Sequence, residues 1–457
     1  MTSVLADRIG GTVYERGDDG FAAAAAGFNL AFAHEPDLVA VATSVTDVVE
    51  AVRFARTAGL RVVVQSTGHG AETPIESGLL LDTSRLDTVR VDPETRTATI
   101  GAGVRWNAVV AAASAYGLTP VTGSSPMVGA VGYLLGGGVG PLARSHGFSS
   151  DYATGFTVVT GAGEVVEANA EQNPDLFWAL RGGKFGLGVV VEMRVRLVAL
   201  TSVYGGSFFV DTPHIERMVR FWTDWTDGAS DLVTTSIQAA AFPPLPQVPE
   251  PLRGKRLLSV RFAYPGDAPE GERLVAPLRG AAPVYLDMLG ELPTTQLGTI
   301  HNDPPDPMPA YVHGTMLDRA DQGLATAFLE TVGPDAVDSP FMVGEMRHLG
   351  AATRRDVPGG SAVGGRGSDY VAAMVCAQPE LFATAAPAAA ERWDGLAAPW
   401  ISDVNNPNVL AQPITTARVD ACWPDDIRAR LEQVRDRYDP DGLTLGWWQP
   451  VSGGGAR

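Results

Sequence analysis

The sequence predicts an α+β protein built from two large domains, and three features of the 457-residue chain carry this prediction. A β-branched run at 61–64 leads into a loop at 65–70 that contains two glycines, as a buried strand does when it delivers a loop to a surface crevice. Glycine is then unusually dense from 117 to 197. After Thr201, longer strand and helix patterns alternate between proline-rich connections, which is typical of an α+β domain with a mainly antiparallel sheet.

The composition is that of an acidic but otherwise ordinary globular chain. Hydrophobic residues make up 45% and charged residues 19%, which predicts ample cores and opposes disorder. The net charge of -18 disfavours nucleic acids and anionic membranes as partners. Cys376 and Cys422 are the only cysteines, which excludes a disulfide framework or a multi-cysteine metal site. Residues 1–10 lack an apolar run of signal-peptide length, and no later segment approaches about 20 uninterrupted apolar residues, so we expect a cytoplasmic protein.

The N-terminal elements follow from caps and periodicity. Five alanines at 22–26 predict a short helical segment. Ser44 and Asp47 resemble a capping box before an apolar stripe, and Gly59 is placed to end that helix just before the 61–64 strand. The same kinds of signal predict a hairpin and a helix further on, at 88–91, 97–100 and 105–116.

Three glycine-rich stretches interrupt the region from 117 to 197, at 123–129, 136–140 and 181–183. A hairpin is predicted between them at 156–160 and 164–167, and an apolar strand follows at 188–191. Glycine at strand ends lets the backbone approach a flat or phosphorylated ligand closely. We therefore expect this region to contribute to a ligand site.

The second half is predicted from alternating strand and helix patterns. Strands are predicted at 207–210, 233–239, 257–264, 341–348 and 370–375. Helices are predicted at 215–225, 322–332, 381–393 and 425–438. The proline-rich connections at 243–251 and 303–309 are interpreted as stiff structural loops.

Other chemical interpretations find little support. The stretch 138–143 matches a loose dinucleotide-binding fingerprint, but no clear βα unit surrounds it and Pro141 falls where the helix should begin. The histidines show no metal-ligand spacing, and the chain has no Walker lysine motif and no nucleophile elbow. Ser124 and Ser125 could serve as nucleophiles, but no base is identifiable for them. Hydrolase and metalloenzyme hypotheses therefore lack residues to carry them, and no metal site is predicted.

The order of the motifs resembles the FAD-binding domain of the vanillyl-alcohol oxidase and p-cresol methylhydroxylase superfamily, and within it the berberine-bridge-like oxidoreductases. The Gly-His-Gly loop, the 123–129 stretch, the glycine run and the strand at 188–191 occur in the expected order, and Tyr-Asp-Pro at 438–440 resembles the C-terminal signature of that family. The resemblance implies three parts: an FAD-binding domain of two portions at 1–200, an α+β substrate-binding domain at 201–400, and a C-terminal segment at 401–457 that returns to the first domain.

The resemblance implies that FAD is bonded covalently to His69. An uncrowded imidazole between two glycines can also reach the edge of a flat ring. Many relatives add a second bond from a cysteine, where this chain has Ser125, a far weaker nucleophile, so we expect attachment through His69 only. The implied cofactor-binding residues are Gln65, Ser66, Thr67, Gly68, His69, Gly70, Ser125, Pro126, Val128, Gly129, Gly132, Tyr133, Gly137, Gly138, Gly140, Gly188 and Val190.

The catalytic base is harder to predict. Relatives often use a tyrosine in a Tyr-x-Asn motif, but this chain has Trp400 at the matching place, and tryptophan cannot act as a base. Strand alternation puts Glu345 and Arg347 on one face and His348 on the other, so these side chains are not expected to share one site. The candidates for the base are Glu345, His348, Tyr370 and Asp403.

The resemblance implies an FAD-linked oxidase of a small organic molecule, with hydride transfer to the flavin and reoxidation by oxygen to hydrogen peroxide. Val128 falls where a side chain gates oxygen in berberine-bridge-like relatives. The missing tyrosine keeps open a flavin-dependent oxidative cyclase or dehydrogenase of secondary metabolism, and a non-redox cyclase that keeps FAD structurally. The acidic charge and the middle-domain aromatics favour a neutral or cationic, partly apolar substrate. The expected partners are this substrate and oxygen, and the oligomeric state stays open.

Overall fold

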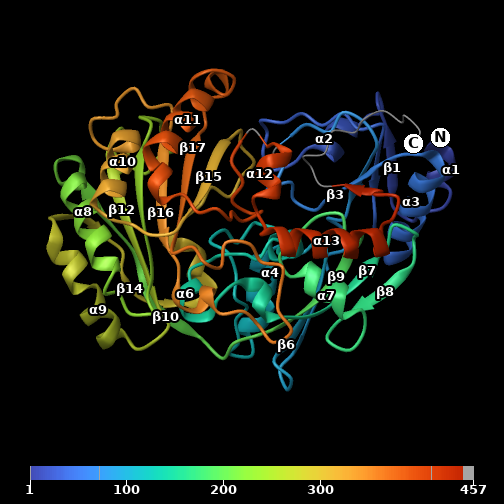
Figure 1. Cartoon of the computed structure of the whole chain (residues 1–457), viewed down its shortest axis with the longest axis horizontal. Coiled ribbons are helices and arrows are strands. Elements are labelled where there is room, and N and C mark those ends of the chain that lie inside the picture. Colours follow the sequence, from blue (N-terminus) through green and yellow to red (C-terminus); the bar gives the residue numbers. More distant parts are fainter. Residues whose placement is uncertain (1, 72, 413, 446–457) are drawn as a thin grey trace.

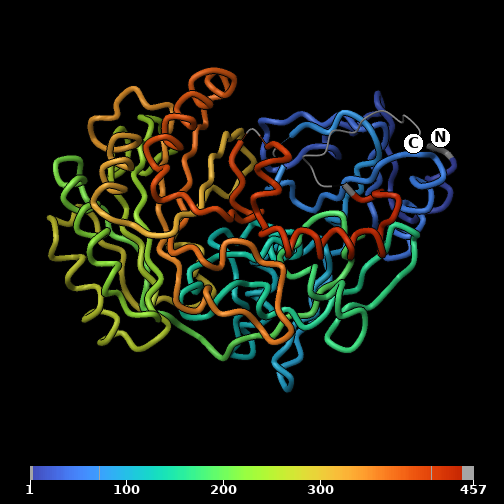
Figure 2. Tube along the Cα trace, in the orientation of Figure 1, coloured from blue at the N-terminus to red at the C-terminus, as the bar shows by residue number. Residues whose placement is uncertain are grey.

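The fold is described from a computed structural model, which covers residues 2–71, 73–412 and 414–445. The described strands form three sheets. Figure 1 shows the large sheet with its helices at one end of the molecule and the two smaller sheets at the other. In Figure 2 the red C-terminal stretch runs back across the blue and green N-terminal parts. The predicted α+β class is confirmed.

The first of the smaller sheets, the mixed sheet, has the order β1-β2-β4-β3-β18. β2, β4, β3 and β18 are parallel, and β1 is antiparallel to β2. Helix α3 packs on this sheet and has the predicted ends, because the Ser44 side chain accepts a hydrogen bond from the Asp47 amide and Gly59 adopts a left-handed conformation. The elements are α1 Thr2–Ala6, β1 Thr12–Glu15, α2 Phe21–Ala25, β2 Leu38–Val41, α3 Val45–Ala58, β3 Val62–Gln65, β4 Leu79–Asp82 and β18 Thr444–Leu445.

The second of the smaller sheets is called the small antiparallel sheet, and its strands have the order β5-β6-β9-β7-β8. Helix α13 packs beside α7 in the same hydrophobic cluster, so the C-terminal stretch is part of this half of the molecule. The Asp439 carboxylate accepts hydrogen bonds from the Leu443 and Thr444 amides and so leads the chain into β18. The elements are β5 Val89–Asp92, β6 Thr97–Gly101, α4 Trp106–Ser114, α5 Ala130–Leu135, α6 Ala143–His146, β7 Ala153–Val159, β8 Val165–Ala168, α7 Pro174–Leu180, β9 Val189–Arg196, α12 Thr416–Asp420 and α13 Asp425–Tyr438.

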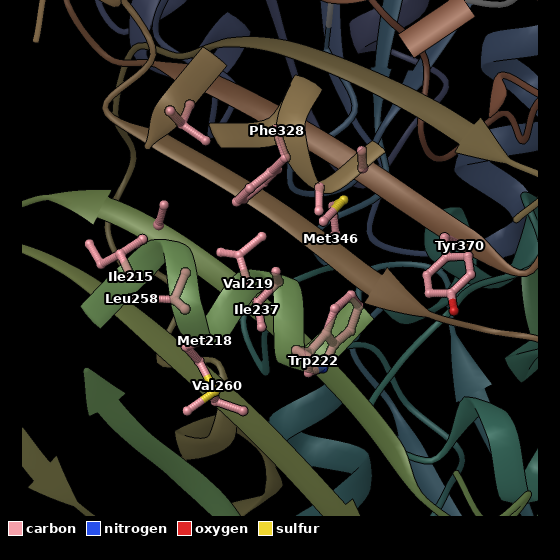
Figure 3. Close-up of a cluster of buried hydrophobic side chains, with 14 of the residues drawn as sticks. Ile215, Met218, Val219, Trp222, Ile237, Leu258, Val260, Phe328, Met346 and Tyr370 are labelled. Carbon is pink, nitrogen blue, oxygen red and sulfur yellow. The ribbon is translucent and has the colours of Figure 1, made fainter. Parts of the chain in front are cut away.

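The large antiparallel sheet has the order β13-β10-β12-β11-β16-β17-β15, and β14 also pairs with β10. Helices α8, α9, α10 and α11 cover one face through a cluster of buried side chains that includes Trp222, Phe328 and Met346 (Figure 3). The elements are β10 Ser202–Asp211, α8 Ile215–Thr226, β11 Thr234–Ala241, β12 Arg256–Tyr264, α9 Ala268–Ala281, β13 Val284–Asp287, β14 Gly290–Pro293, β15 Tyr311–Leu317, α10 Gln322–Val332, β16 Val343–His348, β17 Tyr370–Cys376 and α11 Ala385–Ala397.

Short 3-10 helices occupy several connections, at Ser149–Tyr152, Thr212–His214, Thr294–Ile300, Ala351–Arg354, Pro379–Leu381 and Ala398–Trp400. Among the described residues, no helix is both long and apolar enough to cross a membrane.

The two faces of the large antiparallel sheet meet different parts of the molecule. Met346 and Tyr370 point into the cluster beneath the helices. On the other face, Val371 packs with Ala143 of α6 and with Val139 of the glycine run. This second face is therefore turned toward the N-terminal half, and a site between the two halves of the molecule would use its side chains.

Candidate active site

The 65–70 loop is held against an earlier part of the chain. Gly68 has a φ of 69°, and a Cβ there would overlap Gly27, so the close approach of the two backbones requires glycine. The Phe28 amide donates a hydrogen bond of 2.9 Å to the carbonyl oxygen of Thr67. The loop after β3 is thus fixed against the 27–28 stretch by backbone contacts.

His69 presents a neutral imidazole in this loop. Its Nδ1 lies 2.8 Å from the hydroxyl oxygen of Thr67, and its ring stacks on Phe28 with centroids 3.7 Å apart and an interplanar angle of 14°. Burial, and then the nearby positive charge of Arg105, lower the pKa of His69 to about 4. Its Nε2 is buried and has no hydrogen-bond partner among the described residues. The ring therefore combines an uncharged state with an unused nitrogen.

The second predicted cofactor segment lies beside this loop. Val128 and Pro126 accept hydrogen bonds from the amides of Trp106 and Asn107, at 3.1 and 2.9 Å. A Cβ on Gly129 would lie 3.2 Å from the Ser66 hydroxyl oxygen, so the two segments touch at that point. Two stretches about sixty residues apart in the sequence thus form one surface, as the motif order predicts.

The glycine run shapes the chain beneath Tyr133. Gly137 and Gly138 have φ values of 103° and 85°, and a Cβ on Gly138 would overlap the Tyr133 ring. The Tyr133 hydroxyl donates a hydrogen bond of 2.6 Å to the Val139 carbonyl. A Cβ on Gly140 would overlap the carbonyl oxygen of Thr122. Packing within the protein therefore already requires glycine at these three predicted cofactor positions.

The remaining predicted cofactor residues have mixed environments. Gly188 donates its amide to the Thr444 hydroxyl at 3.2 Å, and Val190 is a core residue. Gly70, Pro126 and Gly132 are exposed.

The polar atoms of the 65–70 loop fit an absent ligand. The Gln65 side-chain oxygen, the Ser66 hydroxyl and the His69 Nε2 are all buried and lack partners among the described residues. Buried polar groups are rarely left without hydrogen bonds, so three in one loop indicate a group that supplies several donors and acceptors. The isoalloxazine edge and pyrophosphate of FAD have such atoms, and glycine-rich backbone suits their close approach. The residues present therefore fit FAD.

Comparison with known proteins agrees with this geometry. Residues 36–169 match the family described as FAD binding domain, so the chain contains an FAD binding domain. Other curated relatives are named FAD-linked oxidoreductases, and a solved structure with the same fold is named BBE-like, which confirms the resemblance inferred from the sequence. It is 34% identical over 236 residues to (R)-6-hydroxynicotine oxidase of Paenarthrobacter nicotinovorans, a match that spans 51% of this chain and 52% of that protein.

Two solved structures share the fold over nearly the whole chain. BBE-like 1 of Physcomitrella patens superposes with a TM-score of 0.82 at 18% identity and covers 100% of both chains. The carbohydrate oxidase of Microdochium nivale superposes with a TM-score of 0.82 at 17% identity and covers 98% of both chains. At these identities the likeness establishes the fold only, and the chain spans about half the length of the first curated relative that it matches.

Glu345, predicted as a candidate base, lies on the sheet face turned toward the FAD binding domain. Its carboxylate accepts hydrogen bonds from Arg261 at 2.6 Å, Arg347 at 2.8 Å and Ser236 at 3.0 Å. Burial alone would raise the pKa of Glu345, but the charges of Arg347 and Arg261 lower it well below its ordinary value. A carboxylate with so low a pKa is a weak proton acceptor, because an effective base has a pKa near the working pH. This geometry suits Glu345 to fixing Arg347.

His348 and Tyr370 lie on the opposite face, as strand alternation predicts for His348. The rings stack with centroids 4.9 Å apart, His348 Nε2 lies 3.0 Å from Arg144, and the Tyr370 hydroxyl lies 2.7 Å from the Thr226 hydroxyl. Burial, and then the charge of Arg144, lower the pKa of His348 to about 2, and burial raises the pKa of Tyr370 to about 12. These two residues therefore do not share a site with Glu345.

The last predicted candidate, Asp403, is exposed on the stretch after Trp400. Trp400 donates a hydrogen bond of 2.9 Å from its ring N–H to Asp321, so its polar atom is turned to a helix cap. The four candidate bases are thus spread over three environments.

Several polar residues beside Glu345 were missed in the sequence. Arg261 is 3% exposed, and its guanidinium also donates to the His301 carbonyl at 2.9 Å. Asp303, which influences Arg347 electrostatically, accepts a hydrogen bond of 2.6 Å from Ser124. A charged residue in the middle of the apolar 257–264 strand is a signal that could have identified Arg261. Nothing local in the sequence indicates the others.

The buried histidines predict a loss of stability in mild acid. The folded-state pKa of His348 lies below the ordinary 6.5, so from pH 6.5 down to about 2 the unfolded chain binds a proton that the folded chain does not. Stability should then fall with decreasing pH by up to about 1.4 kcal/mol per pH unit for each such histidine. His348→Gln keeps an acceptor for Arg144 but cannot be protonated. We expect it to lower the dependence of stability on pH by the contribution of one proton, up to about 1.4 kcal/mol per pH unit. Urea unfolding at pH 7, 6 and 5 measures it, and an unchanged slope would contradict the assignment.

Proposed function

We propose that this protein is an FAD-dependent oxidase that holds FAD covalently through His69 alone and oxidises a neutral, partly apolar small molecule. The observation that carries the proposal is the neutral His69 imidazole, with a buried unpartnered nitrogen, in the glycine loop of an FAD binding domain. Bound FAD supplies the acceptor for a hydride from the substrate, and oxygen takes the electrons onward to hydrogen peroxide. The expected cytoplasmic location is part of this proposal.

Attachment through a single residue is supported by the surroundings of Ser125. The side chain is buried at 9% exposure, and its hydroxyl oxygen accepts a weak hydrogen bond of 3.4 Å from the Met127 amide. The described structure places no base on this hydroxyl within hydrogen-bond distance. An unactivated hydroxyl is far less nucleophilic than a thiolate near neutral pH. Ser125 is therefore not expected to bond to the flavin.

The substrate class is supported by the side chains on the inward face of the large antiparallel sheet. Cross-strand partners form rows that run across the strands. One row is entirely apolar and contains Val312, Val375, Val343 and Ala240. The row that lies two rows further along the strands begins with the apolar Met316 and Val371. It continues across the sheet with the polar Arg347, Ser236 and Arg261. The face thus changes from apolar to hydrogen-bonding along the strand direction.

The charges at the polar end balance one another. Arg261 and Arg347 lie against Glu345, and Asp303 adds a second carboxylate near Arg347. Burial keeps the pKa of His301, which lies 3.7 Å from Glu345, well below its ordinary value, so its ring is neutral. A site with two cations and two anions does not select a charged substrate. It suits a neutral molecule with an apolar body and a hydrogen-bonding end.

This interpretation separates two substrate classes. A carbohydrate would need hydrogen-bonding groups along its whole length, which the apolar row does not provide. The experiment is anaerobic mixing of the flavin-loaded protein with aromatic or terpenoid alcohols, and separately with oligosaccharides, while flavin absorbance is followed. Saturable bleaching by the alcohols supports the proposal. Bleaching by sugars alone would overturn the substrate class, and bound flavin that no substrate reduces would favour the non-redox cyclase.

The size of the Val128 side chain is expected to decide whether oxygen can reach the reduced flavin and act as electron acceptor. Val128 is half-buried, and its side chain packs at the edge of the hydrophobic cluster around Trp106. If it leaves oxygen a path to the reduced flavin, Val128→Leu should slow reoxidation several-fold by steric occlusion and spare flavin reduction. Stopped-flow mixing of the reduced protein with oxygenated buffer measures this rate. A rate unaffected by the substitution removes Val128 from the mechanism, and a slow wild-type rate favours a dehydrogenase.

A further inference from the structure

Phe28 is an aromatic residue without a place in a hydrophobic core. It belongs to none of the hydrophobic clusters formed by the described residues, and it is only partly buried. Its ring lies instead parallel to the imidazole of His69, with centroids 3.7 Å apart. The two residues are 41 positions apart, so this contact depends on the tertiary fold. Phe28 thus lies outside the core and is stacked on the polar ring of His69, which indicates that it helps to orient that ring.

The backbone of Phe28 is fixed from two sides. Its amide donates to the Thr67 carbonyl at 2.9 Å, and its carbonyl accepts from the Met308 amide at 3.1 Å. The next residue, Asn29, is 7% exposed and exchanges two 3.0 Å hydrogen bonds with the backbone of Ala310. The position of Phe28 is thus set by main-chain contacts and by Asn29. Replacement of its side chain should leave the local fold in place.

The imidazole is constrained in two independent ways. Phe28 covers one face and sets the plane of the ring, because parallel stacking at this distance excludes large tilts. Thr67 lies 2.8 Å from Nδ1 and sets the rotation of the ring within that plane. Nε2 is left without a partner among the described residues. The ring is therefore held in one orientation before any ligand binds.

We propose that Phe28 and Thr67 are positioning residues that orient the His69 imidazole for its covalent attachment to the flavin. This inference rests on the proposed attachment through His69. Attachment forms one C–N bond to a ring methyl group and breaks one C–H and one N–H bond. The two hydrogens and their two electrons first reduce the flavin ring, and oxygen then accepts them to give hydrogen peroxide. Because the reacting atoms must meet in a narrow range of geometry, orientation of the imidazole should limit the rate.

The test compares attachment with binding in the full-length protein. Each variant is freed of noncovalent flavin, mixed with FAD in air, and sampled for intact mass under denaturing conditions, so that the fraction carrying the mass of FAD gives the attachment rate. Loss of the stacked ring in Phe28→Leu should slow attachment about three- to tenfold. Phe28→Trp, which keeps a flat face, should restore most of the rate. Thr67→Val, which lacks the hydroxyl group, should slow attachment. Thr67→Ser, which keeps the hydroxyl group, should attach flavin at close to the wild-type rate.

Three further measurements make the outcome decisive. The dissociation constant of noncovalent FAD, read from flavin fluorescence, should change little in Phe28→Leu, and a loss of affinity equal to the loss of rate would overturn the positioning role. Phe54→Leu alters a buried aromatic of α3, in a hydrophobic cluster that contains neither Phe28 nor His69, and should attach flavin at the wild-type rate. Attachment in Phe28→Leu as fast as in the wild type would also overturn the inference. A wild-type protein that never gains the mass of FAD would instead refute the proposed attachment itself.

Discussion

The His69→Ala protein is expected to lose all covalently held flavin and to bind FAD only reversibly. His69 is the residue of the 65–70 loop with a neutral, buried and unpartnered ring nitrogen, so its removal takes away the nucleophile that the fold provides. Loss of the bond to the imidazole nitrogen should also lower the reduction potential of the flavin. For a two-electron couple, each 30 mV corresponds to about 1.4 kcal/mol, or about a tenfold change in the equilibrium constant for flavin reduction. Substrate oxidation should slow accordingly.

Acid precipitation separates the outcomes for His69. The wild-type pellet should be yellow and its intact mass should include FAD, whereas the His69→Ala pellet should be colourless. Ser125→Ala is the matched control, because it alters the other position where relatives attach flavin, and it should leave the pellet yellow. Covalent flavin in His69→Ala would show that another residue forms the bond. A colourless wild-type pellet would exclude covalent attachment altogether.

The parts of the fold that the sequence predicts are those encoded by neighbouring residues. The cap at Ser44 and the left-handed Gly59 define α3 because each acts within one helical turn. The pairing of β18 with β3 joins residues about 380 positions apart, and no local pattern encodes it. Helix α9 was missed because Pro277 lies inside it and argues against a helix in the sequence alone. Tertiary packing decides such cases.

The same distinction holds for the candidate site. His69 and Gly129 were predicted because each belongs to a contiguous motif, and the structure brings their loops together. The pair of Arg261 and Glu345 joins residues 84 positions apart, so the low pKa of this carboxylate could not be inferred from the sequence. Strand alternation correctly separated Glu345 from His348. It could not show which of the two faces meets the FAD binding domain.

Replacement of Glu345 should be among the most destabilising single changes in the chain. Its side chain is 8% exposed, and its carboxylate is the shared partner of Arg261, whose side chain is 4% exposed, and of Arg347. In Glu345→Gln the shape is kept, but an amide NH₂ group must face at least one donor, and Arg261 is left buried without its counter-charge. Removal of one member of a buried ion pair typically costs about 3–5 kcal/mol, and we expect a loss of this size. Urea unfolding of the flavin-loaded protein, followed by tryptophan fluorescence, measures it.

The matched control is an exposed ion pair of similar chemistry. Glu192 pairs with Arg90 at 2.7 Å, but the Arg90 side chain is 61% exposed, so Glu192→Gln should cost no more than about 1 kcal/mol. The same two variants distinguish a structural role of Glu345 from a catalytic one. If Glu345 fixes Arg347, folded Glu345→Gln should bind substrate more weakly and keep the pH profile of kcat. If it is instead the base, flavin reduction in the folded variant should nearly cease, and the acidic limb of the kcat profile should disappear.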